Sequence, residues 1–297
     1  MNVSTPKREK PCFIIVRHGQ SITNVNRSIH NRVSDPAVWL TEKGRQQARQ
    51  AGRFLADYFA KMPKAERPQR LRIMRSTYRR ARQTARLIEA ELRENSGIPH
   101  IDLKDLDRLR ELEFGYSGHP EAMQPHVRWL SNLLRFQGFK YFAPRAGGES
   151  PAWMEPRVRS ALDAMFRDFR ENGITHFVVP NHGLTTRIIV RALMGYNNQW
   201  YENEPNPGNC AIRIIDGGYD KGYVFPNPNG QWEADWREEP EDKTKLNPDG
   251  LFFSEDEMRR LIKIQETRPA IMADLDNLFR ADPKLRASDA IRLVLNE

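Results

Sequence analysis

Apolar segments alternate with helical patterns over the first three quarters of the chain. Phe13–Val16 and Phe177–Val179 are continuous apolar runs and Leu71–Met74 alternates, so all three predict strands. Between them, apolar residues recur every three or four positions, which predicts amphipathic helices. The inward-facing positions are Ala48, Ala51, Leu55 and Phe59, then Ala81, Ala85, Ile88 and Leu92, then Val158, Leu162, Met165 and Phe169. This order is typical of an α/β domain with a mainly parallel sheet.

The pattern continues to about residue 226. A helix is predicted over Thr185–Met194, and strands at Cys210–Ile215 and Tyr223–Phe225 flank a turn at the glycine pair 217–218. Thr41 is a predicted N-cap for the first long helix.

The remaining segments suggest an insert and an appendage. From Ile101 to Pro144 the pattern is irregular, apart from one predicted helix near Val127–Phe136. We therefore expect a domain over 1–226 that carries an insert near 116–144. Residues 227–297 begin with a stretch rich in Pro, Asn, Gly and charge and continue with capped helical patterns, which predicts a linker and a helical C-terminal extension.

Composition restricts the class of protein. The chain has 297 residues, of which 39% are hydrophobic and 29% charged, as expected for a water-soluble globular protein. No apolar run approaches the ~18 residues of a membrane span, and the first residues lack a secretory signal, so we expect a cytoplasmic protein without a membrane partner. The two cysteines are expected to be reduced, and the net charge of +8 favours anionic partners.

The candidate chemistry lies where the first strand ends. Arg17, His18 and Gly19 follow the apolar run, and ligands bind at the carboxyl ends of strands in open α/β sheets. A neutral imidazole can attack phosphorus, and a guanidinium can hold phosphate oxygens with a planar set of donors. The triplet therefore suggests phosphoryl chemistry, although a strand-end histidine in a plain turn would have the same sequence.

Two later segments support the same chemistry. His182 and Gly183 follow the strand Phe177–Val179, so the strand, His-Gly, helix order occurs twice. Arg80 lies at the predicted start of a helix, where an anion is favoured. Neighbouring Arg79 and Arg82 fit a solvated helix face instead.

Four motifs together resemble the histidine phosphatase superfamily, in the branch that contains cofactor-dependent phosphoglycerate mutase and many phosphatases. They are Arg17-His18-Gly19-Gln20-Ser21 with Asn24, Ser76-Thr77-Tyr78-Arg79-Arg80-Ala81-Arg82-Gln83-Thr84-Ala85, Leu109-Arg110-Glu111-Leu112-Glu113-Phe114-Gly115, and His182-Gly183. The resemblance spans roughly residues 11 to 226. It implies a phosphoglycerate mutase-like three-layer α/β sandwich.

The resemblance also implies roles for individual residues. His18 would become phosphorylated, and Glu111 rather than Glu113 would donate the proton to the leaving oxygen. The phosphate pocket would be formed by Arg17, Asn24, Arg80 and His182, with Gln20 and Gly183 as further binding residues. Gln20 stands where many members have Glu, and Thr77, Tyr78 and Asn181 also depart from the family pattern.

The leading hypothesis is a phosphatase that hydrolyses phosphomonoesters through a phosphohistidine on His18. Two alternatives stay open: a phosphoglycerate mutase-type transfer, and a binding module for phosphorylated ligands that does not turn over. We expect a phosphorylated small molecule as partner, no nucleic acid and no cofactor. We also expect no metal, because no histidine pair has metal-ligand spacing. The sequence leaves the oligomeric state undecided, with a homodimer as one option.

Overall fold

A computed structural model describes residues 8–26, 30, 33–115, 140–224 and 281. The chain divides into two compact units, Met1–Leu112 with Met154–Glu238, and Glu113–Trp153 with Glu239–Glu297. All helices and strands described below, except the first residues of one helix, belong to the first unit. The helix predicted near Val127–Phe136 and the extension predicted at 227–297, except residue 281, lie outside the described residues.

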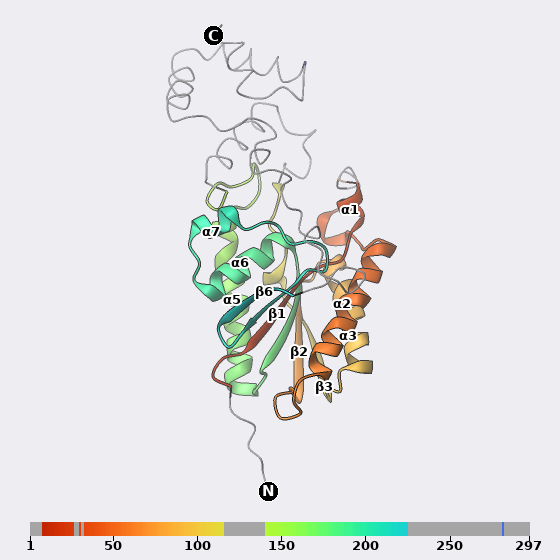
Figure 1. The fold of residues 1–297 in the computed structure, drawn as a ribbon. Helices are drawn as coiled ribbons and strands as arrows, with labels where there is room; N and C mark the ends of the chain where they lie inside the picture. The colour runs from red at the N-terminus through yellow and green to blue at the C-terminus, as the bar shows by residue number, and fades with distance from the viewer. Residues whose placement is uncertain (1–7, 27–29, 31–32, 116–139, 225–280, 282–297) are drawn as a thin grey trace. The chain divides into compact units, whose positions relative to one another are not determined.

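One six-stranded sheet organises the first unit (Figure 1). Its strand order is β3-β2-β4-β1-β5-β6, in which β3, β2, β4 and β1 are parallel and β5 and β6 are antiparallel to their neighbours. The strands are β1 (Cys12–Arg17), β2 (Arg70–Arg75), β3 (His100–Asp105), β4 (His176–Asn181), β5 (Ile212–Asp216) and β6 (Tyr219–Tyr223). The expected α/β class with a mainly parallel sheet is confirmed.

Helices cover both faces of this sheet and make it a three-layer sandwich (Figure 1). On one face α2 and α3 pack side by side. On the other face, the ring of Phe13 in β1 meets that of Phe166 in α5 with centroids 5.4 Å apart. The α-helices are α1 (Ile22–Val25), α2 (Glu42–Ala60), α3 (Arg79–Asn95), α5 (Pro151–Asn172), α6 (Gly183–Met194) and α7 (Asn198–Asn203), and two 3₁₀ turns are η2 (Asp35–Ala37) and η3 (Asp107–Leu109).

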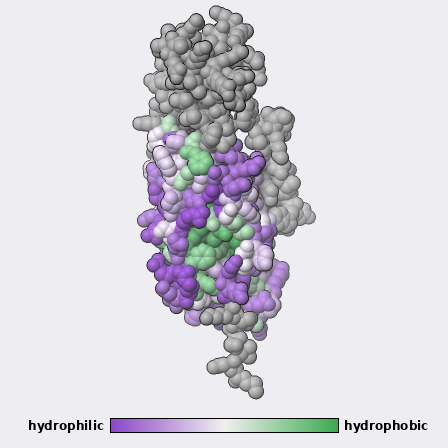
Figure 2. Space-filling view, turned by 90° about the vertical axis from the view of Figure 1, so that its left-hand side faces the viewer, coloured by the Kyte–Doolittle hydropathy of each residue, from purple (hydrophilic) through white to green (hydrophobic). Residues whose placement is uncertain are grey.

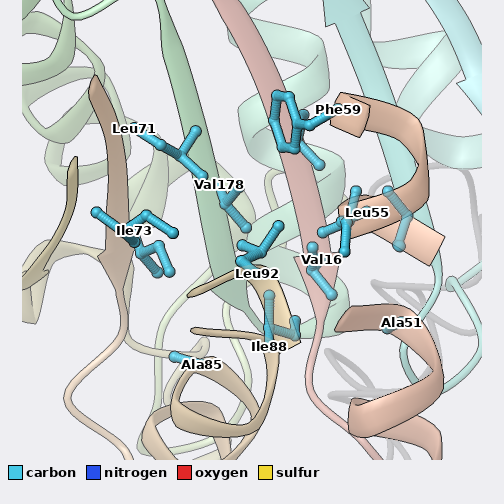
Figure 3. Close-up of a cluster of buried hydrophobic side chains, with 14 of the residues drawn as sticks. Val16, Ala51, Leu55, Phe59, Leu71, Ile73, Ala85, Ile88, Leu92 and Val178 are labelled. Carbon is cyan, nitrogen blue, oxygen red and sulfur yellow. The ribbon is translucent and has the colours of Figure 1, made fainter. Parts of the chain in front are cut away.

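The periodic apolar side chains of the sequence form the core between the sheet and the helices α2 and α3. Figure 3 shows Leu55 and Phe59 of α2 near Val16 of β1, and the α3 side chains Ile88 and Leu92 in the same cluster. All five are fully buried. Burial of such side chains is the main favourable contribution to folding, roughly 1.5–3 kcal/mol for each.

Several element boundaries differ from the sequence prediction. β3 is an edge strand within the stretch expected to be irregular, and only Ile101 of its six residues is buried, so it carries no apolar run. β6 begins at Tyr219 and ends at Tyr223, the first residue of the predicted Tyr223–Phe225, because the turn at 217–218 pairs Asp216 directly with Tyr219. The short helix α7 was not anticipated.

Hydrophilic residues dominate the face shown in Figure 2, on the side of α5 and α7 in Figure 1, with a smaller apolar area near its middle. Among the described residues, no helix is both long enough and apolar enough to span a bilayer.

Candidate active site

The two His-Gly turns lie side by side because their strands are neighbours. β1 and β4 pair in parallel, and their last residues, Arg17 and Asn181, lie opposite each other. A histidine directly follows the end of each strand. The His18 backbone N–H donates to the Asn181 carbonyl at 2.9 Å, and the imidazole rings of His18 and His182 meet edge to face with centroids 5.3 Å apart. Pairing of parallel strands thus brings together two histidines that are far apart in the sequence.

The hydrogen bonds of His18 define which of its nitrogens can react. Nδ1 lies 2.7 Å from the Gly19 carbonyl oxygen, which can only accept, so Nδ1 carries the proton. Nε2 therefore has the lone pair, and it accepts a hydrogen bond from Nε of Arg80 at 3.2 Å. The arrangement presents Nε2 as a nucleophile.

The surroundings keep His18 uncharged. Burial lowers its pKa well below the usual 6.5, and the guanidinium groups of Arg80 and Arg17 lower it further. The side chain is 4% exposed. A neutral imidazole is the form that can attack phosphorus.

His182 follows β4 as the N-cap residue of α6 and is fully buried. Its Nε2 lies 2.8 Å from the Ser76 hydroxyl, whereas its Nδ1 is buried without a hydrogen-bond partner in the described part of the chain. Burial lowers the pKa of His182 well below 6.5, and Arg80, His18 and Arg17 add to this effect. In the free protein it is neutral, so any charge on it depends on an arriving anion.

Arg80 and Arg17 both lie beside His18, from two different elements. Arg80 is the second residue of α3, and its terminal nitrogens donate to the Asp35 carboxylate. Arg17 ends β1, and its side chain donates to the carbonyl of Pro207. Both arginines are nearly fully buried, so two guanidinium groups lie beside His18 in a poorly hydrated environment.

Glu111 follows η3 and reaches the N-terminus of α6. Its side-chain oxygens accept hydrogen bonds from the backbone N–H groups of Leu112 at 2.9 Å and of Leu184 and Thr185 at 3.3 Å. Arg157 of α5 donates to the carbonyl of Glu111 at 3.1 Å, which supports the loop from the other side. These three hydrogen bonds hold the carboxyl group of Glu111 in one orientation.

The side chains of two expected binding residues, Asn24 and Gln20, contact their neighbours rather than the His18 ring. Asn24 is exposed, and its side chain accepts from Ser21 at 2.9 Å and from Asn209 at 3.2 Å, and Asn209 in turn donates to the His18 carbonyl at 3.2 Å. Gln20 accepts from the Thr41 hydroxyl at 2.9 Å.

Gly183 lies close to the loop that contains Asn206. A Cβ at this position would overlap the side-chain amide of Asn206, the residue just before Pro207, whose carbonyl accepts from Arg17. Gly183 therefore lets the first turn of α6 pack against this loop, which holds one of the pocket arginines.

The sequence did not single out Asp35, Ser76 or Arg157 for the site. Ser76 begins one of the four motifs and directly follows the end of β2, and this position could have indicated a site residue. Asp35 and Arg157 had no signal, since each acts on a residue distant in the sequence.

No metal site is formed by the residues that the structure describes: no three His, Cys, Asp or Glu side chains among them are grouped so as to bind an ion. Cys12 and Cys210 are buried free thiols. The side chains gathered around His18 carry imidazole, guanidinium and carboxyl groups.

The fold and the two facing histidines define a known class. The family model of the histidine phosphatase superfamily (branch 1) matches residues 13–225, and the chain belongs to this family. The resemblance inferred from the four motifs is confirmed.

Among curated proteins, the phosphoglycerate mutase-like protein AT74 of Arabidopsis thaliana is 31% identical over 81% of this chain and 74% of its own length. A broad-range acid phosphatase of Saccharomyces cerevisiae is 23% identical over 69% of this chain and 84% of its own. Relatives of this chain thus include proteins named as phosphatases and as mutase-like.

Among solved structures, a putative alpha-ribazole-5'-P phosphatase of Escherichia coli superposes with a TM-score of 0.52, at 17% identity, over 76% of this chain and 100% of its own. The YhfR protein of Bacillus stearothermophilus gives 0.51 at 23% identity, over 75% and 98%. These similarities establish the shared fold.

Proposed function

We propose that the protein is a phosphomonoesterase that works through a phosphohistidine on His18. The observation that carries the proposal is a buried, neutral imidazole whose Nε2 lone pair faces Arg80, with Arg17 and His182 beside it. A phosphoryl group in transfer has charge on three equatorial oxygens, and such donors stabilise that charge without reorganisation.

In the first step, Nε2 of His18 attacks phosphorus and the bond from phosphorus to the leaving oxygen breaks. Arg80 then turns its Nε–H from the imidazole to a phosphoryl oxygen. Glu111 donates its proton to the leaving oxygen, so that an alcohol departs rather than an alkoxide. His182 supplies a further donor from its buried ring.

In the second step, water attacks the phosphohistidine and the bond between Nε2 and phosphorus breaks. Glu111, now a carboxylate, accepts the proton from that water. Inorganic phosphate leaves, and both residues return to their starting states. One carboxyl group thus serves as acid and then as base.

Replacement of His18 tests the proposal. His18→Ala is expected to lower the hydrolysis of p-nitrophenyl phosphate by ~10³-fold or more, since the variant lacks the proposed nucleophile. His100→Ala is the matched control, because His100 is an exposed histidine on the edge strand β3. Wild type quenched in an alkaline denaturant, in which the acid-labile phosphohistidine survives, should carry labelled phosphate on His18. Hydrolysis by His18→Ala at the wild-type rate would contradict the proposal.

A mutase is the second candidate, and the phosphoglycerate mutase-like name of the relative at 31% identity is what favours it. Both activities use the same phosphohistidine, so the products distinguish them. With a phosphoglycerate as substrate, a phosphatase releases inorganic phosphate, whereas a mutase yields the isomer without free phosphate. Binding of phosphate without either product would instead indicate a binding module.

A further inference from the structure

The guanidinium of Arg80 contacts protein groups through all three nitrogens. Nε donates to His18, Nη1 donates to the backbone and side-chain oxygens of Asp35 at 2.7 and 2.8 Å, and Nη2 donates to the other carboxylate oxygen at 3.1 Å. This is a bidentate pair, the strongest geometry for arginine and a carboxylate. The pocket arginine thus already binds an anion that belongs to the chain.

Asp35 is placed so that this contact can be exchanged. The aspartate begins the short turn η2, and its side chain is 28% exposed, whereas that of Arg80 is only 5% exposed. The carboxylate can therefore rotate into water while Arg80 stays buried. Asp35 also lies near His30, with its Oδ1 4.0 Å from Nδ1 of the imidazole ring.

A phosphoryl group and this carboxylate require the same donors. Arginine presents its terminal nitrogens as one planar pair, so two anions cannot both take the bidentate position. The carboxylate also cancels one unit of positive charge beside His18, which weakens the attraction for a phosphate dianion. Both effects act against phosphate binding.

From this geometry we infer that Asp35 competes with phosphate for Arg80 and lowers the affinity of the pocket for substrate and for inorganic phosphate. Asp35 is a positioning residue, because it acts through Arg80 and not on the reacting atoms. The inference rests on the proposed function, since it assumes that the phosphoryl group binds Arg80. Its consequence for a phosphatase is faster product release and weaker product inhibition.

The test is Asp35→Asn, which keeps the shape of the side chain and removes its charge. Inorganic phosphate, titrated into the purified full-length protein by calorimetry, is expected to bind about tenfold more tightly. KM for p-nitrophenyl phosphate should fall with the dissociation constant, and kcat should not rise, because product leaves more slowly. Asp35→Glu, which restores a carboxylate, should move the phosphate affinity back toward wild type.

Asp57→Asn is the matched control, because Asp57 is exposed and pairs with Lys61 on α2. It should change neither KM nor phosphate binding. If Asp35→Asn weakens phosphate binding or leaves it unchanged while its unfolding midpoint matches wild type, the inference is wrong, and Asp35 then only supports Arg80. Tighter phosphate binding by a protein that hydrolyses no phosphomonoester would uphold the competition and refute the proposed function instead.

Discussion

Glu111 and Glu113 illustrate how two similar residues can lie in different surroundings. They are two positions apart, and motif alignment assigned the proton donor to Glu111. In the structure Glu111 is 6% exposed and bonded to the N-terminus of α6, whereas Glu113 is exposed. A proton donor must be oriented and shielded from bulk water, and only Glu111 meets both conditions.

Leaving-group dependence tests this assignment. Glu111→Gln retains the shape of the side chain but cannot donate or accept the proton, so hydrolysis of an alkyl phosphate should slow by ~10²- to 10⁴-fold. Loss with p-nitrophenyl phosphate should be smaller, because p-nitrophenolate leaves without protonation. Glu113→Gln should leave both rates near wild type in steady-state assays. Equal losses from both variants, or no loss from Glu111→Gln, would rule out Glu111 as the acid.

At the scale of elements, the loop after β1 depends on close contact with the start of α2. A Cβ at Gly19 would overlap the Gly44 carbonyl, and a Cβ at Gly44 would overlap the Gln20 carbonyl. Thr41, the N-cap of α2, donates its backbone N–H to Gln20 at 2.9 Å and accepts from Gly44 at 3.0 Å. The helix terminus therefore supports the loop that presents His18.

Gly44→Ala is expected to destabilise the protein, although alanine is the better helix former. The overlap should lower the free energy of unfolding by about 1–3 kcal/mol. Displacement of the Gly19–Gln20 backbone should also lower kcat/KM by ~10- to 100-fold. Urea unfolding and p-nitrophenyl phosphate kinetics measure the two effects, with exposed Gln46→Ala on the same helix as control. A stabilised, fully active Gly44→Ala variant would show that α2 does not support the loop.

At the scale of the whole molecule, buried imidazoles make the free energy of unfolding depend on pH. His18, His176 and His182 are at most 4% exposed. Burial lowers the pKa of His176 to about 3, and Arg8 and Lys221 contribute in the same direction. Each of these pKa values is below its value in the unfolded chain, so the unfolded chain binds protons first as the pH falls.

Above pH 6.5 these histidines should therefore not affect the free energy of unfolding. Below pH 6.5 the free energy of unfolding should fall with pH, and the contribution of His176 should end near pH 3. Each histidine contributes up to about 1.4 kcal/mol for each pH unit. Urea unfolding at pH 7.5, 6.0 and 5.0 measures the slope, and His176→Gln should reduce it. The pKa values of Asp102 and Asp220 are lowered from the usual 3.8, so these carboxyl groups titrate below the three pH values of this measurement. A slope that His176→Gln leaves unchanged would refute the assignment.

Much of the fold was predictable because the relevant signals are local. Strands β1 and β4 are continuous apolar runs, and α2 and α3 show clear helical periodicity, so their order alone indicated a mainly parallel sheet. β3 was missed because an edge strand is half exposed and carries no such run. β3 is recognisable as a strand only from its backbone pairing with β2 in the structure.

The sequence by itself determined that two strands end in His-Gly, that Arg80 begins a helix and that the chain belongs with the histidine phosphatases. These features depend on residues that are close together in the chain. Only the tertiary structure decided that Nε2 of His18 has the lone pair, that Glu111 binds α6 and that Asp35 binds Arg80. Side-chain partners depend on packing between distant segments, and no local pattern encodes that packing.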